Sequence, residues 1–372
     1  MANSNLTNAK RAKNDEFYTQ YVDIQKEIEA YLEYNPDVFR GKVVYCNCDD
    51  PFESNFFRYF VLNFKKLGLK QLITTSYKPS PVANTQIELF GDDKSLTKSK
   101  GRPKITANKF IINEVHDIDD DGEFNLKEVA KQLKANKHNE WMPLEGDGDF
   151  RSNECISLLK QSDVVVTNPP FSLFREYVKQ LFDHKKKLVI IGNMNAITYK
   201  EIFPLIKANR LWLGATGNGS DMVFAVPNGI EIAESDRQKA ARLGYVGDYT
   251  RLGNSCWFSN LDHGRRHKPL PLMTRADIIK FGTKKPFKKY DNYNAIEISL
   301  VKNIPSDYDG VMGVPISFLD KYSPEQFEII GATESEGKGF SNGLWDEKSK
   351  VSQPLIENNR VYKRIFIRHK KK

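Results

Sequence analysis

A loop of four consecutive residues has the types and the order needed to hold a planar amine: Asn168, Pro169, Pro170 and Phe171. The loop follows the apolar run 164–166, so a buried strand is expected to end there. Proline has a fixed φ and no N–H, so the carbonyls of such a loop stay available as acceptors. The Asn168 side-chain oxygen and the Pro169 carbonyl could accept both hydrogens of an amino group conjugated to an aromatic ring, and Phe171 could stack on that ring. The alternative is a plain proline turn after a buried strand.

An acidic residue, Asp149, lies nineteen positions before Asn168 in the glycine-rich segment 146–150 and is followed by Phe150. The apolar spacing after this segment predicts a helix that includes Leu158. The segment on its own is equally typical of a surface turn rich in Gly and Asp.

A third polar segment follows the apolar run 42–46 and precedes Ser54 and a phenylalanine-rich helix. It holds Cys46, Asn47, Cys48, Asp49 and Asp50. A doubly wound α/β fold places its cofactor turn at such a junction between strand and helix.

The elements around these segments predict an α/β fold. Residues 17–20 precede an amphipathic helix, and residues 173–181 have the spacing of a helix after the proline loop. Residues 187–195 form another apolar strand. Segments 210–214, 222–227 and 255–261 are expected to be short strands that complete the same sheet.

In chain order, segments 17–20, 42–51, 146–150 and 168–171 resemble motifs X, I, III and IV of amino-methyltransferases that use S-adenosylmethionine. This is the gamma motif order. From about residue 13 to the carboxyl end, and least clearly over 80–145, the chain resembles the EcoRI-type adenine-specific (N6) DNA methyltransferases. The resemblance implies a Rossmann-like catalytic domain over residues 1–261 and a smaller α+β target-recognition region over 262–372.

The resemblance also implies roles for single residues around S-adenosyl-L-methionine. The pocket would be closed by Phe17 and Thr19, the methionine part would be held by Cys46, Asn47, Cys48, Asp49 and Asp50, and the adenine would be held by Asp149 and Phe150. Of these, Asp49 or Asp50 would bind the ammonium group, and the turn amides would bind the carboxylate. The family turn is rich in glycine, whereas Cys46, Asn47, Cys48 and Asp49 stand in its place here.

The implied reaction is methyl transfer to N6 of an adenine that is flipped out of double-stranded DNA into the Asn168–Phe171 pocket. This chemistry requires no metal. Methylation of cytosine N4, of RNA or of a protein glutamine remains open, because related loops serve those reactions. A catalytically idle DNA-binding protein on the same scaffold is a further alternative, motivated by the unusual turn at Cys46–Asp49.

Basic residues are concentrated beyond the last expected catalytic strand. The formal net charge of the 372 residues is +8. Segment 265–289 contains one acid, Asp277, and the basic residues Arg265, Arg266, Lys268, Arg275, Lys280, Lys284, Lys285, Lys288 and Lys289. We expect DNA contact from Arg265, Arg266, Lys268, Lys284, Lys285, Lys288 and Lys289. A solvated loop is the alternative.

The composition predicts a cytoplasmic protein, and the resemblance implies a prokaryotic cell or a phage as its source. No apolar run approaches the roughly 18 residues of a membrane span, and the start has no signal-peptide core. The four cysteines form no C-x-x-C pair, so they are expected to be reduced. We expect a monomer, with any cognate restriction endonuclease acting separately.

Segment 117–128 has acidic residues at the spacing of a calcium loop, from Asp117 to Glu128. The preceding residues 110–115 have the pattern of a strand, whereas an EF-hand needs a helix there. An acidic turn that caps the next helix is therefore the preferred interpretation, and a hard cation is the alternative.

Overall fold

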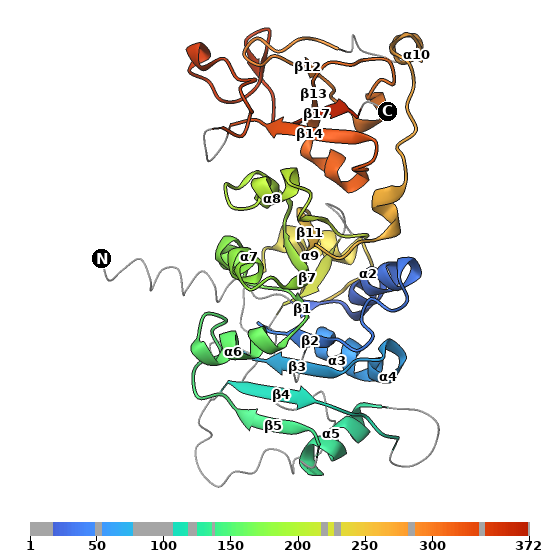
Figure 1. Ribbon diagram of the computed structural model, residues 1–372, viewed down its shortest axis with the longest axis vertical. Coiled ribbons are helices and arrows are strands. Elements are labelled where there is room, and N and C mark those ends of the chain that lie inside the picture. The colour runs from blue at the N-terminus through green and yellow to red at the C-terminus, as the bar shows by residue number, and fades with distance from the viewer. Residues whose placement is uncertain are drawn as a thin grey trace, which may run out of the picture.

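The computed structural model describes residues 18–48, 54–76, 107–117, 125–135, 138–216, 222–226, 232–281, 287–334 and 339–370. Figure 1 shows a molecule that is elongated in one direction. A C-terminal sheet occupies one end, and the edge of a large sheet, formed by β4 (Asn108–Ile112) and β5 (Glu140–Pro143), occupies the other.

The large sheet is mixed and has the strand order β5-β4-β3-β2-β6-β7-β11-β8. Its other strands are β2 (Val43–Cys46), β3 (Gln71–Thr75), β6 (Val164–Thr167), β7 (Lys187–Asn193), β8 (Trp212–Leu213) and β11 (Ser255–Ser259). Strands β3, β2, β6 and β7 are mutually parallel. Strand β4 is antiparallel to both β3 and β5, and β11 is antiparallel to both β7 and β8. Strand β5 therefore runs in the same direction as β3, and its carboxyl end lies at the same edge as those of β2 and β6.

The central strands are buried on both faces, which explains their continuous apolar sequences. Val44 and Val166 pack with helices α2 (Tyr21–Tyr34) and α3 (Asn55–Leu62) on one face. Tyr45 and Val165 point to the opposite face, where α6 (Asn153–Gln161) and α7 (Phe174–Asp183) pack. The strand order reverses between β2 and β6, because β3 follows on one side and β7 on the other. In open α/β sheets, ligands bind beyond the carboxyl ends of the strands at such a reversal.

The helices of the described residues are α2 (Tyr21–Tyr34), α3 (Asn55–Leu62), α4 (Phe64–Leu67), α5 (Leu126–Ala135), α6 (Asn153–Gln161), α7 (Phe174–Asp183), α8 (Phe203–Lys207), α9 (Glu234–Ala241) and α10 (Arg275–Phe281). Helices α2, α3, α5, α6 and α7 lie where the apolar spacing predicts helices, whereas α9 and α10 were not predicted. Ser54 caps α3 by accepting hydrogen bonds from the Phe56 and Phe57 N–H groups, each at 3.1 Å. The described residues also form short 3₁₀ helices: η3 (Phe171–Leu173), η4 (Met194–Thr198), η5 (Gly264–His267), η6 (Val301–Asn303), η7 (Ile316–Lys321) and η8 (Glu347–Ser349).

One expected strand of the large sheet belongs elsewhere. Strand β9 (Val223–Ala225) pairs with β1 (Tyr18–Thr19) and β10 (Tyr249–Arg251) in a separate three-stranded antiparallel sheet. The expectation that segment 222–227 completes the large sheet was therefore wrong. Its partner β1 lies some 200 residues away in the chain, so local pattern could not reveal the pairing.

The C-terminal sheet has the order β12-β13-β17-β14, with β12 (Ile296–Glu297), β13 (Met312–Pro315), β14 (Phe327–Ala332) and β17 (Arg364–His369). A hairpin of β15 (Leu355–Ile356) and β16 (Asn359–Arg360) turns at Glu357 and Asn358, which both have positive φ, as a type I′ turn requires. Within the sheet, buried Arg364 donates to both carboxylate oxygens of Glu297, at 2.7 and 3.0 Å. Arg364 is therefore an internal ion-pair partner.

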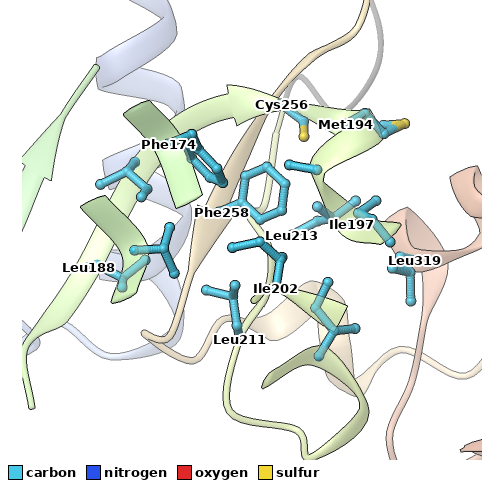
Figure 2. Packing of buried hydrophobic residues seen from close by; sticks show 14 of the residues in the cluster. Phe174, Leu188, Met194, Ile197, Ile202, Leu211, Leu213, Cys256, Phe258 and Leu319 are labelled. Carbon is cyan, nitrogen blue, oxygen red and sulfur yellow. The ribbon is translucent and has the colours of Figure 1, made fainter. Parts of the chain in front are cut away.

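A single hydrophobic cluster joins the two large parts of the molecule. Figure 2 shows Leu319 of η7 at the right of this cluster, on the same side as Ile197, with Ile202 and with Leu213 and Phe258 of the large sheet nearer its centre. No helix in the described part of the chain is long and apolar enough to cross a membrane.

Candidate active site

The proline loop begins where β6 ends and lies at the carboxyl edge of the large sheet. Asn168 is partly buried, and Pro169 and Pro170 are buried. The Pro170 carbonyl accepts the Leu173 N–H at 3.0 Å, which starts η3. Among the described residues, no hydrogen bond ends on the Pro169 carbonyl. This carbonyl therefore keeps its acceptor capacity, as proline in a loop predicts. Phe171 packs against the apolar cluster of α2 and α3.

The turn after β2 is fixed to the catalytic strand through Asn47. The Thr167 hydroxyl donates to the Asn47 carbonyl, and the Tyr177 hydroxyl donates to the Asn47 side-chain oxygen. Both donors belong to β6 or α7, the elements that flank the proline loop. Asn47 is 3% exposed, so these bonds hold the turn after β2 against the loop at the end of β6.

The next residue explains how this turn forms without glycine. Cys48 has φ 63°, the left-handed conformation that glycine adopts most readily. Its backbone thus takes the shape of a glycine turn at a local conformational cost. Cys46, in contrast, is fully buried in the cluster under α2 and α3 and has the surroundings of a core residue.

The glycine-rich segment after β5 reaches the same edge. Gly148 has φ 78°, and a Cβ there would lie 1.9 Å from the Ser76 carbonyl oxygen, so this contact with the end of β3 requires glycine. The Phe150 ring packs edge-on to Tyr177, with 5.0 Å between ring centres. Tyr177 therefore connects the turn after β2 with the segment after β5.

The Asp149 carboxylate has an internal cationic partner. It accepts the Arg151 Nη2 at 2.6 Å and the Arg151 Nε at 2.9 Å, and Arg151 also reaches Glu176 at 3.3 Å. Burial acts to raise the pKa of Asp149, but the hydrogen bonds and charge of Arg151 outweigh it, so the net pKa is lowered. Asp149 is ionised at neutral pH and can act as an acceptor.

Thr19 belongs to β1, which contacts α3, the helix after the turn that follows β2. Its carbonyl accepts Asn55 Nδ2 at 2.8 Å, which ties β1 to the start of α3. The residue is 3% exposed, and among the described residues its hydroxyl has no hydrogen-bond partner. Buried hydroxyls normally have partners, so this one is suited to meet a bound molecule. Phe17, Asp49 and Asp50 lie outside the described residues.

Sequence comparison agrees with this arrangement. The family model described as adenine-specific methyltransferase EcoRI matches residues 5–370. The chain belongs to this family. It is therefore an adenine-specific methyltransferase.

Three curated relatives are similar over most of their length. The chain is 44% identical to the Type II methyltransferase M.EcoRI of Escherichia coli, over 99% of this chain and 97% of that protein. It is 36% identical to M.MpnI of Mycoplasma pneumoniae, over 87% and 83% of the two chains. It is 31% identical to M.MgeORF184P of Mycoplasma genitalium, over 97% of each. No solved structure matches the chain.

In this family member, two of the basic residues expected to contact DNA have internal partners. Arg266 is 7% exposed, lies 3.6 Å from the Trp212 ring centre and pairs with Asp262 at 2.8 Å. Arg265 donates to the Ala215 carbonyl at 2.8 Å and forms an ion pair with Asp320. Both side chains thus connect the large sheet to the C-terminal region. The number of basic residues in the segment could not predict this structural role.

The other expected DNA contacts are exposed or lie outside the described residues. Lys268, Lys288 and Lys289 are exposed, and Lys288 pairs with Glu357 at 2.8 Å. Lys284 and Lys285 lie outside the described residues. In Figure 1, helix α10 of the basic run is at the upper right, whereas α6 and α7 of the catalytic edge are at the left.

In the residues that the structure describes, the acidic segment before α5 caps that helix. The Glu128 carboxylate accepts the Asn125 N–H at 2.9 Å, and the Asn125 side chain accepts the Glu128 N–H at 3.4 Å. This reciprocal pair has the pattern of a capping box. Residues 118–124 lie outside the described residues. Among the described residues, no group of three or more metal-ligating side chains occurs.

Sequence reasoning missed Thr167 and Tyr177 as parts of the site. A signal for Tyr177 was present, because a tyrosine on the buried face of a helix needs a partner for its hydroxyl. The identity of that partner, Asn47, lies 130 residues away and required the fold.

Proposed function

We propose that this chain transfers a methyl group from S-adenosyl-L-methionine to N6 of an adenine extruded from double-stranded DNA. One observation carries the proposal: the Asn168–Pro169 acceptors lie at the carboxyl end of β6 and are tied through Asn47 to the turn after β2. A loop that can hold an amine is thereby fixed beside a turn that can hold a cofactor. The strand order supports a Rossmann-like arrangement, in which ligands meet at this reversal.

The described residues fit S-adenosyl-L-methionine. The Thr19 hydroxyl is buried without a protein partner, Cys48 opens the turn after β2 in a glycine-like conformation, and Asp149 offers an ionised acceptor. We assign the methionine part to the turn after β2 and the adenine to Asp149 and Phe150. When bound, the cofactor supplies an electrophilic methyl group on a sulfonium.

The protein contributes position and charge stabilisation. Asn168 and Pro169 would accept the two N6 hydrogens and stabilise the positive charge that builds on the nitrogen. Phe171 would lie against the base. The prolines and the hydrogen bonds of Asn47 with Thr167 and Tyr177 fix the loop before the amine arrives. Little reorganisation is therefore needed on binding.

We assign recognition of the DNA to the C-terminal region, with phosphate contacts from exposed lysines such as Lys268 and Lys289. Arg265 and Arg266 are left out of this set because they contact the Ala215 carbonyl and the Trp212 ring, which lie in the part of the protein that holds the large sheet. Since the three relatives are named Type II methyltransferases, we extend the proposal to protection of DNA against a separately acting restriction endonuclease.

The test is expression of the chain in a host without DNA methylation. Digestion of its DNA to nucleosides and mass spectrometry should reveal N6-methyladenine, and single-molecule sequencing should give the methylated site. Asn168→Ala serves as the matched control. The appearance of N4-methylcytosine, or equal methylation by both proteins, would contradict the proposal.

A further inference from the structure

The contact between the catalytic edge and the C-terminal region presents one exposed aromatic side chain, Tyr362. We propose that Tyr362 stacks on a base of the duplex next to the extruded adenine and thereby stabilises the opened DNA. The inference rests on the proposed function and names a DNA-contacting residue outside the catalytic loop.

A series of contacts connects the catalytic loop with Tyr362. After the loop, α7 begins with Phe174, which lies so close to Gly192 of β7 that a Cβ there would be 2.4 Å from its ring. The next residue, Arg175, lies over the Tyr199 ring at 4.0 Å, at the end of η4. The Tyr362 hydroxyl donates to the Asn195 side-chain oxygen in the same 3₁₀ helix at 2.9 Å. Tyr362 thus lies next to the 3₁₀ helix that α7 contacts.

The backbone of Tyr362 is fixed as well. Arg364 Nη1 donates to the Tyr362 carbonyl at 2.9 Å, while the same guanidinium is held by buried Glu297. Lys363 Nζ donates to the Thr198 hydroxyl at 2.9 Å. Two hydrogen bonds of Tyr362 and one of Lys363 therefore restrain this residue before any ligand arrives, which lowers the entropy lost on binding.

Despite these restraints, Tyr362 is 57% exposed. An aromatic ring held rigidly on a surface is the kind of group that anchors an interface. Its surroundings suit a polyanion, because Arg360 is exposed and Lys363 is the next residue in the chain. A duplex whose adenine enters the Asn168–Phe171 pocket would pass over this junction.

Stacking is the chemistry that the ring offers to DNA. An extruded nucleotide leaves its neighbours without a stacking partner, and a planar side chain can replace that contact. Base–aromatic stacking does not depend on base identity, so Tyr362 would support extrusion without reading sequence.

Phe281 provides a matched control. It is 71% exposed, also aromatic and also C-terminal to the large sheet, but it lies on α10 at the upper right of Figure 1, away from α7. Removal of its ring tests the effect of deleting any exposed aromatic side chain.

The experiment uses the full chain and a duplex that carries 2-aminopurine at the target adenine of the site found by sequencing. Fluorescence of 2-aminopurine rises when it leaves the stack, so one titration reports both binding and extrusion. The proteins compared are wild type, Tyr362→Ala, Tyr362→Phe, Asn195→Ala and Phe281→Ala. Thermal unfolding and cofactor titration confirm that each variant is folded.

We expect Tyr362→Ala to bind the duplex roughly 10- to 100-fold more weakly and to lose most of the fluorescence rise, with unchanged cofactor affinity. Tyr362→Phe and Asn195→Ala keep the ring and should stay within about threefold of wild type, as should Phe281→Ala.

Two results would overturn the inference. If Tyr362→Ala matches wild type, the ring does not touch DNA. If Tyr362→Phe or Asn195→Ala fails as badly as Tyr362→Ala, the residue acts through its hydrogen bond between the two regions. In both cases N6-methyladenine formation by wild type would leave the proposed function intact. Absence of that product from wild type would end both proposals.

Discussion

Asn168 and Asp149 are both polar residues at the carboxyl edge of the sheet, but their surroundings indicate different roles. Asn168 is neutral and directly precedes two buried prolines. Asp149 is ionised and already bound to an arginine. A neutral acceptor can stabilise a charge that appears only during reaction, whereas an ionised one can bind a ground-state amine. The two residues should therefore affect different measured quantities.

Replacement of Asn168 by alanine should lower turnover about 100- to 1,000-fold and leave cofactor binding nearly unchanged. The reason is that a preorganised acceptor contributes mainly when charge develops on N6. Single-turnover kinetics at saturating cofactor measures the effect. Near-normal turnover by a folded Asn168→Ala protein would remove the assigned role.

Replacement of Asp149 by alanine should weaken S-adenosyl-L-methionine binding about 10- to 100-fold, because a hydrogen bond to a charged acceptor is removed. Affinity for DNA should change little. Calorimetric titration with cofactor gives the answer. Arg151→Ala is the control, since it breaks the same ion pair and keeps the carboxylate; equal losses in both variants would mean that Asp149 acts only by holding Arg151.

A Thr19→Val change keeps the volume of the side chain and removes a buried hydroxyl that, within the described part of the chain, has no protein partner. The unfolding free energy should stay equal or rise slightly, because an unsatisfied polar group becomes apolar. Cofactor affinity should fall. Thermal melts with and without cofactor separate these effects, and a variant that binds the cofactor as well as wild type would place the hydroxyl outside the pocket.

At the scale of elements, segment 262–270 forms the joint between the large sheet and the C-terminal region. His267 Nε2 lies 2.9 Å from Asp262, and its Nδ1 lies 2.9 Å from Glu325. Its ring also stacks on Tyr34 of α2. Both ring nitrogens face carboxylates, which requires both to be protonated. Partial burial acts to lower the pKa of His267, but the two carboxylates outweigh it and raise the pKa.

This joint should weaken as the pH rises. A histidine whose folded pKa is raised adds stability that is complete below its unfolded pKa of about 6.5 and is lost as pH passes the folded pKa. Because His267 is 33% exposed, we expect a contribution of about 1 kcal/mol or less. Urea unfolding of wild type and His267→Asn should differ at pH 6 and converge by pH 9.

A constant difference across that range would mean that folding does not shift the pKa of His267. The nearby His263 does not complicate the measurement. Its burial lowers its pKa to about 4 in the folded state, and because both proteins contain His263, its own pH dependence cancels in the difference between them.

The strands that carry the site could be predicted because their sequences are buried on both faces and are therefore apolar without interruption. This was true of β2, β6 and β7, and the capping serine at 54 marked the start of α3. Strand β9 could not be placed, since three residues carry too little pattern to choose a partner. Its neighbours β1 and β10 were chosen by contacts distant in the chain.

The same limit applies to the site. The residue types of Asn168 and Asp149 indicate their chemistry. The hydrogen bonds of Asn47 with Thr167 and Tyr177 and the ion pair of Asp149 with Arg151 depend on the three-dimensional packing and could not be predicted. Arg266 illustrates the reverse error: its position in a basic run predicted DNA contact, whereas Trp212 and Asp262 surround it.

At the scale of the whole molecule, the net charge of +8 favours association with DNA, which is a polyanion. Combined replacement of Lys284, Lys285, Lys288 and Lys289 by alanine should weaken binding to every duplex. The slope of log K against log salt should fall by about 0.9 for each phosphate that the variant no longer neutralises.

Lys65 and Lys66 are exposed on α4 and provide a matched control, because their removal should leave the slope unchanged. If the quadruple variant also keeps the slope, these lysines do not touch phosphate. The duplex would then be sought along the face that carries Arg360 and Tyr362.

The continuous apolar cluster around Leu319 has a consequence for engineering. Target-site specificity is often changed by grafting the reading module of one enzyme onto the catalytic body of another. Here the residue that replaces Leu319 would have to pack against Ile197 and Leu213, and the new module would have to restore the contacts of Arg265 with the Ala215 carbonyl and of Arg266 with Trp212. A graft cut at residue 262 alone would expose apolar surface on both fragments and separate buried Arg266 from Trp212 and Asn209. New specificities would be reached more easily by changes within the C-terminal sheet than by its exchange.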